Sequence, residues 1–102
     1  MKKNTYKIKG QVWLWGYSDV SPWHFVSVPK KETAQIKKDF GKLARGWRSI
    51  PIMATIGKTS WKTSIFLDSR TDTYLLPLKS LVRKKEMVYE GELVSFTFKI
   101  LL

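Results

Sequence analysis

The sequence predicts a mainly β domain: a closed six-stranded barrel with two short helices, in the order β-β-α-β repeated twice. Three observations predict it. Six short segments have strand character, most of them alternating apolar and polar residues with a period of two. Only two segments have helical character, and a proline precedes each. The two halves, residues 5–56 and 59–100, share this order, so strands from both can close one pseudo-twofold barrel without exposed edges.

The first half opens with two predicted strands. Residues 5–15, TYKIKGQVWLW, alternate between an apolar face and a face that carries lysines and Trp13. Gly10 interrupts the pattern, which is typical of a bulge or of a bend at a barrel corner. After the loop GYSDVSP, residues 23–28 form the second strand. Trp13 and Trp15 either pack beneath that loop, which we expect, or form an exposed patch that a partner covers.

A helix follows, because the period changes at Pro29, which suits a first helical turn. Three apolar residues recur at helical spacing: Ile36, Phe40 and Leu43. Gly41 and Gly46 are expected stop signals. Residues 50–56, IPIMATI, alternate again and predict the third strand.

The second half repeats the order. Residues 59–67 follow a tight Gly57-Lys58 connection and predict a fourth strand, in which Thr63 and Ser64 point to opposite faces. After the polar loop DSRTDT, residues 73–77 form a short fifth strand. Ser80 is expected to cap a helix through Glu86, seated on the barrel by Leu81 and Val82. Gly91 then turns the chain into the last strand, ELVSFTFKI, whose apolar residues alternate with polar ones.

Length and composition indicate one folded domain over residues 1–102. The chain has 43% apolar and 14% aromatic residues, which argues against disorder. No apolar run approaches the roughly 18 residues that span a bilayer, and MKKNTYKIKG is not a secretory signal. There is no cysteine, which excludes disulfides and thiolate chemistry. We therefore expect a cytoplasmic protein without membrane insertion.

Charge is the strongest compositional signal. Nineteen Lys and Arg against eight Asp and Glu give +11 and a pI of about 10.0. Such an excess attracts nucleic acid, anionic lipid or acidic proteins, although a soluble protein can also simply be basic. Residues 30–48 hold seven of the basic side chains against Glu32 and Asp39. A second basic run, LVRKKE, lies in the predicted second helix. Helices at opposite ends of a barrel would divide this charge into two clusters.

Residue types that usually carry catalysis are scarce. His24 is the only histidine and lies in a predicted strand, where a structural or exposed role is expected. A zinc site would need scattered carboxylates for most of its ligands. No Ser-His-Asp constellation, phosphate-binding glycine loop or dinucleotide fingerprint is present. The sequence therefore predicts no enzyme, no cofactor and no metal site.

Binding is the better prediction, and eight residues are its candidates. Lys79 and Arg83 are four apart and share one helix face, where Arg83 can grip a phosphate or carboxylate with two donors. Alternatively, Arg83 ties the second helix to the barrel. The basic run continues in Lys84 and Lys85, and either Thr63 or Ser64 can join the cluster. Trp61 and Trp23 can stack on bases or line a ligand pocket.

Three stretches carry a family likeness over about residues 5–100: WHFVSVP, GKTSWKTSIF and YLLPLKSLVRKKEMVYEGELVSFTF. Together they resemble the domain-of-unknown-function family numbered 1905, found alone or beside bacteriocin-protection-related segments. The resemblance implies a double-split β-barrel, the architecture of bacterial transition-state regulators and antitoxin DNA-binding domains. The family commonly has Gly-Asp before the last strand. Here Gly91-Glu92 stands there, and the first half has only GKLARGWRS.

The expected function is therefore a small non-enzymatic binding module of an uncharacterised family, acting as a monomer or weak dimer. One alternative is nucleic-acid or polyanion binding through Lys/Arg patches. The other is small-ligand binding in a Trp-lined pocket.

Overall fold

A computed structural model of the chain describes residues 3–16, 22–44 and 46–102. The elements are β1 (Thr5–Trp15), β2 (Trp23–Ser27), α1 (Lys30–Phe40), two single turns of 3-10 helix (Gly41–Leu43 and Gly46–Arg48), β3 (Ser49–Ile56), β4 (Thr59–Asp68), β5 (Thr73–Pro77), α2 (Ser80–Glu86) and β6 (Leu93–Ile100). The predicted cover of Trp13 and Trp15 by the loop that contains residues 17–21 lies outside the described residues, as does Arg45 of the basic segment.

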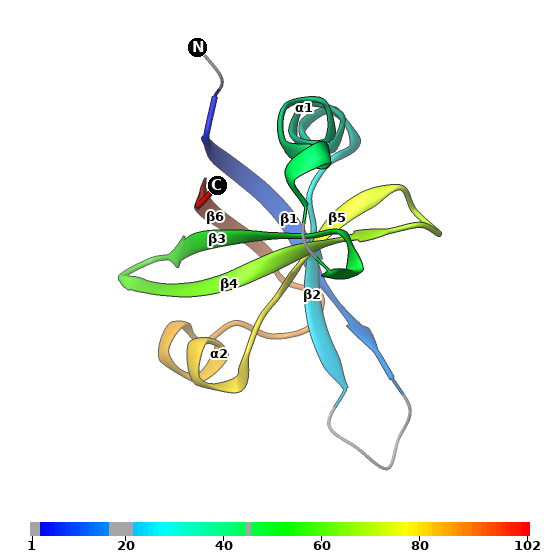
Figure 1. The fold of residues 1–102 in the computed structure, drawn as a ribbon. Coiled ribbons are helices and arrows are strands. Elements are labelled where there is room, and N and C mark those ends of the chain that lie inside the picture. The colour runs from blue at the N-terminus through cyan, green and yellow to red at the C-terminus, as the bar shows by residue number, and fades with distance from the viewer. Residues whose placement is uncertain (1–2, 17–21, 45) are drawn as a thin grey trace.

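The six strands form one closed barrel in the order β1-β2-β5-β4-β3-β6, and every pair is antiparallel. This confirms the predicted fold class. The strand order is the same for the two halves of the chain. The pair β1–β2 of the first half corresponds to β4–β5 of the second, and β3–β4 corresponds to β6–β1. The pseudo-twofold similarity of the halves, and with it the double-split description, stays a prediction. Figure 1 shows α1 and α2 on opposite sides of the strands.

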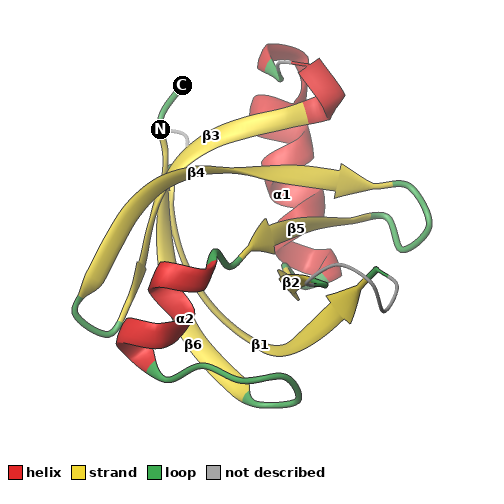
Figure 2. Cartoon of the chain, turned by 90° about the horizontal axis from the view of Figure 1, so that it is seen from below, coloured by secondary structure: helices red, strands yellow, loops and turns green. Residues whose placement is uncertain are grey.

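The barrel opens where strands diverge. β4 pairs with β3 from Thr59 to Phe66, but with β5 only from Phe66 to Asp68. The first part of β4 therefore lacks β5 as a neighbour on its other edge. α2 contacts β4, and Figure 2 shows the helix beside this part of the sheet. A short helix thus occupies the space that a longer β5 would fill.

The core lies inside the barrel, on the face of each strand that the alternation predicts. Its fully buried side chains come from all six strands and both helices: Tyr6, Val12, Val26, Val28, Ile36, Ile50, Ile52, Ile65, Tyr74, Leu76, Val82 and Phe98. The β1–β6 register passes through Gly10 without interruption, so the predicted bulge is wrong. Glycine is needed there for space, because a Cβ at Gly10 would lie 2.7 Å from Cγ1 of Val26.

Several local predictions about the helices are wrong. Leu43 lies beyond the end of α1 in a 3-10 turn and is 55% exposed, so it is not part of the core. Ser80 does not cap α2, since the N-cap position is Lys79 and no side chain caps this end. Leu81 is 56% exposed, and Val82 alone of the α2 residues is buried. Pro29 likewise occupies the N-cap position of α1 rather than its first turn.

Among the described residues, no helix has the length and apolar character that crossing a bilayer requires.

Candidate functional site

A pocket of about 340 Å³ lies at the opening between β4 and β5. The start of β2, the first part of β4, the end of β5 and the first turn of α2 surround it. Its lining residues are Pro22, Trp23, His24, Trp61, Lys62, Thr63, Pro77, Leu78, Lys79 and Arg83. We call this the α2 pocket. It combines apolar walls with several basic side chains, as ligand sites commonly do.

Backbone hydrogen bonds bring the parts of the α2 pocket together. The Leu78 N–H donates to the His24 carbonyl over 2.8 Å, which joins the end of β5 to the start of β2. The chain then turns into α2 at Lys79, whose carbonyl accepts from the Arg83 N–H over 3.1 Å. Lys79 and Arg83 are therefore one helical turn apart, and both reach the pocket, as their spacing predicts.

Arg83 is held by two acceptors. Its Nε donates to the Leu78 carbonyl over 3.0 Å, and its Nη1 lies 3.3 Å from Nε2 of His24. Nδ1 of His24 lies 3.1 Å from the Pro22 carbonyl, which can only accept. Since a guanidinium can only donate, Nε2 of His24 is the acceptor of this contact, and Nδ1 is the donor to the Pro22 carbonyl. The contacts also support the alternative in which Arg83 ties α2 to the barrel.

Positive charge dominates the α2 pocket. Lys62, Lys79 and Arg83 line it, and none of the described residues in the lining is a carboxylate. Glu86 of α2 is turned elsewhere, because it accepts a 2.6 Å hydrogen bond from the Thr59 hydroxyl. Two of the five Arg83 donors are used by Leu78 and His24, so others are free to meet a ligand. The pocket therefore favours an anionic group.

Aromatic side chains form two walls of the α2 pocket. Trp61 is 7% exposed and belongs to the barrel core, so it is a fixed surface. Trp23 is 63% exposed, and its ring stacks against Phe25 with centroids 6.1 Å apart. A flat apolar group can lie against these rings while an attached anion meets the basic side chains.

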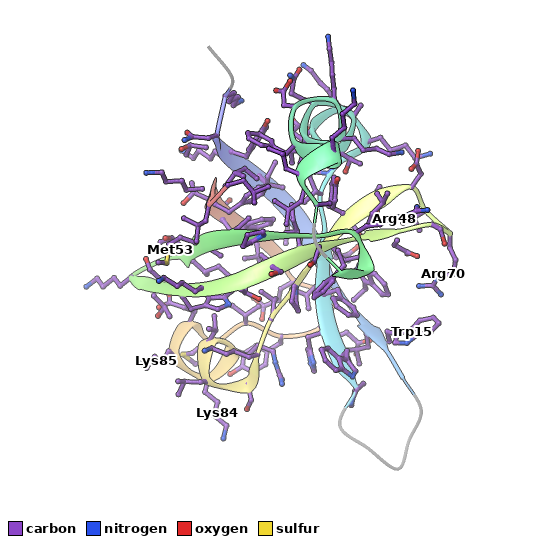
Figure 3. The ribbon with its side chains drawn as sticks, in the orientation of Figure 1. Trp15, Arg48, Met53, Arg70, Lys84 and Lys85 are labelled. Atoms are coloured by element: carbon purple, nitrogen blue, oxygen red, sulfur yellow. The ribbon has the colours of Figure 1, made fainter. Side chains whose placement is uncertain are left out.

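Five of the eight predicted site residues meet in this pocket: Trp23, Trp61, Thr63, Lys79 and Arg83. Ser64 faces the other side of β4, as the strand alternation predicts. Lys84 lines an adjoining hollow, which shares His24 and Arg83 with the α2 pocket and also contains Glu90, and Lys85 lines neither. Figure 3 shows Lys84 and Lys85 on the outer side of α2.

Of the lining residues that the sequence did not predict, two have polar side chains. His24 was assigned a structural or exposed role, and its contact with Arg83 spans 59 residues of sequence. Lys62 lies on the outward face of β4, opposite to Trp61 and Thr63, and reaches the pocket because β5 does not cover that part of the strand. Neither contact has a local sequence signal.

A second apolar groove, of about 560 Å³, lies on the outside of the barrel. Trp15, Trp23, Phe25, Phe66, Leu67 and Leu75 line it. The Arg70 guanidinium lies 3.9 Å from the centroid of the Trp15 ring, and both are labelled in Figure 3. Burial would raise the pKa of Asp68, but its hydrogen bonds with Arg70 and Thr71 bring that pKa below 3.8. Trp13 packs on Phe25 and donates to the Ser27 hydroxyl over 2.9 Å.

The two basic segments do not form one surface. The described lysines of residues 30–48 lie on or just after α1, on the opposite side of the strands from α2 (Figure 1). Lys37 of this group pairs with Asp72 over 2.9 Å. The charge of the two helices is therefore divided, as expected for helices at opposite ends of the barrel.

Within the described part of the chain, no group of three or more His, Asp or Glu side chains is placed to hold a metal ion.

Comparison with known proteins bears on family rather than on activity. No curated protein matches the chain. The sequence profile of one family matches residues 9–98, nearly the whole chain. The protein therefore belongs to the DUF1905 family, described as a domain of unknown function.

Proposed function

We propose that this domain is a non-enzymatic binding module that takes a small organic anion with a flat apolar part into the α2 pocket. The observation that carries the proposal is the set Lys62, Lys79 and Arg83 around a Trp61 wall, with no carboxylate among the described residues of the lining. Arg83 is also pre-positioned by Leu78 and His24, which lowers the entropy cost of binding. The proposed compartment is the cytoplasm.

A binding role is favoured over catalysis by how His24 is used. One ring nitrogen faces a carbonyl and the other faces Arg83, so neither is directed at a serine, threonine or carboxylate of the pocket. General acid–base work needs such a group within hydrogen-bond reach of the reacting atom. Here the histidine orients Arg83 instead.

The proposal is tested by calorimetric titration with naphthoate and with the uncharged naphthamide. Because an anion meets several cations in the pocket, we expect naphthoate to bind at least tenfold more tightly than naphthamide. K79Q removes one charge from an exposed side chain and should weaken naphthoate binding about fivefold, the factor for roughly 1 kcal/mol. The matched control is K85Q, which makes the same charge change on the same helix outside the pocket and should bind normally. Equal binding of the acid and the amide, or equal losses in both variants, would contradict the proposal.

A further inference from the structure

Much of the positive charge lies outside the α2 pocket, and part of it forms an ordered array on the barrel surface. β4, β3, β6 and β1 are consecutive strands of the barrel. Where they pair, their outward positions carry mostly lysines, hydroxyl side chains and a glutamine, with four apolar residues among them: Thr5, Lys7, Lys9, Gln11, Ser49, Pro51, Met53, Thr55, Ser60, Lys62, Ser64, Phe66, Leu93, Ser95, Thr97 and Lys99. We call this surface the lysine face. Met53 of this face is labelled in Figure 3.

The strand register sets the spacing of these lysines. One row across the four strands reads Lys62, Met53, Lys99 and Thr5. The next row reads Ser60, Thr55, Thr97 and Lys7. Lys9 follows on β1 opposite Ser95. Because neighbouring strands are about 4.8 Å apart and diagonal neighbours about 7–8 Å, the backbone positions that carry successive lysines are about 7–10 Å apart.

Carboxylates are missing from the lysine face. The described acidic residues lie on α1, in and near the β4–β5 turn, on α2 and in the connection to β6: Glu32, Asp39, Asp68, Asp72, Glu86, Glu90 and Glu92. The ion pairs of the described residues join Lys37 to Asp72 and Arg70 to Asp68, so no lysine of the face is neutralised by one. Neighbouring like charges on a sheet are destabilising. A concentration of lysines on one face is therefore expected where an anionic partner binds and offsets the repulsion between them.

We propose that the lysine face binds the phosphate backbone of double-stranded nucleic acid without reading its sequence. Lysines neutralise phosphates, and serine and threonine hydroxyls donate to phosphate oxygens, which are the contacts that position a protein on a duplex. Four strands span about 14 Å between their outer axes, more than the major groove of about 12 Å, so the face lies across the backbone and does not enter the groove.

The composition of the face separates this partner from two others. Single-stranded nucleic acid is held by several aromatic side chains that stack on successive bases, and the outward positions of the lysine face carry a single one, Phe66 at the end of the β3–β4 pairing. Anionic membranes are held by basic residues together with a cluster of apolar side chains that enter the lipid boundary, and here Met53, Phe66 and Leu93 lie in different rows of the face and form no such cluster. Duplex phosphates need neither.

The test is the fluorescence anisotropy of a labelled duplex titrated with the full chain at about 50 and 200 mM salt. If four lysines contact phosphates, the wild type should bind the duplex about 150-fold more weakly at the higher salt than at the lower salt. The variant K7Q/K9Q/K99Q keeps one of these contacts, so its binding should weaken only about 3-fold over the same change in salt. The control variant K31Q/K38Q/K42Q changes the same number of charges on and just after α1 and should keep the wild-type salt dependence. Circular dichroism melts verify that both variants are folded.

Four results would overturn the proposal: no duplex binding at the lower salt, loss of binding in the α1 variant instead, equal losses in both variants, or tighter binding to phosphatidylserine vesicles than to duplex. The face variant leaves Lys62, Lys79 and Arg83 in place, so it should bind naphthoate as the wild type does. Failure of the nucleic-acid proposal can therefore be distinguished from failure of the proposed pocket function.

Discussion

Tyr6 shows how a single buried group shapes stability. Its ring is 1% exposed and stacks on Phe98 with centroids 5.4 Å apart. Its hydroxyl is buried and has no hydrogen-bond partner among the described residues. Burial, with smaller contributions from Asp39 and Glu32, raises the pKa of this phenol above 10.0. The folded state therefore keeps Tyr6 protonated at pH values where the unfolded chain ionises.

The Y6F variant should consequently be more stable than the wild type. Removing an unpaired buried hydroxyl while keeping the ring is expected to add about 1 kcal/mol to the free energy of unfolding, or about 4 °C in Tm. Because the pKa of Tyr6 is raised in the folded state, the wild type loses stability as the pH rises from 10.0, the ordinary pKa, through the folded pKa. Y6F should therefore lose less Tm than the wild type between about pH 9 and pH 11. A Y6F protein that melts several degrees lower, with an unchanged alkaline loss, would contradict this assignment.

Within an element, alternation and helical spacing predict which strands and helices form, but not every contact they make. The strand segments 50–56 and 73–77 and the helix 80–86 lie where their patterns predict. Spacing alone did not distinguish Leu81 from Val82, because a seven-residue helix has too few turns to define its buried stripe. Gly10 was expected to mark a bulge or a bend; the bulge is wrong, and the glycine is required by the approach of Val26 from a strand that the local sequence does not reveal.

Val82 anchors α2 and so supports the α2 pocket. V82A removes two buried methyl groups and should lower the free energy of unfolding by about 2 kcal/mol. L81A truncates a neighbouring side chain that is more than half exposed and should change it by less than about 0.5 kcal/mol. Urea unfolding of both variants measures the difference. Equal costs would show that α2 is seated differently from the structure.

At the scale of the molecule, the sequence predicts the closed barrel and the division of charge between two helices better than it predicts the sites. Five of the eight candidate residues meet in the α2 pocket, since Lys79 and Arg83 are close in sequence and Trp61 and Thr63 share a strand face. His24 joins them only through the pairing of β2 with β5. The lysine face depends on the register of four strands drawn from both halves of the chain. Contacts of this kind depend on the pairing and register of strands that are distant in the sequence, which no local pattern specifies.

The central claim is that the α2 pocket binds an aromatic anion, and the most direct test is a crystal structure of the protein with bromonaphthoate. Anomalous scattering locates the bromine, and the electron density places the carboxylate. We expect the naphthalene ring of the ligand to lie against Trp61 and its carboxylate to lie within hydrogen-bond distance of Arg83. Bromine in the outer groove beside Trp15 and Phe66, or a carboxylate turned away from Lys79 and Arg83, would contradict it.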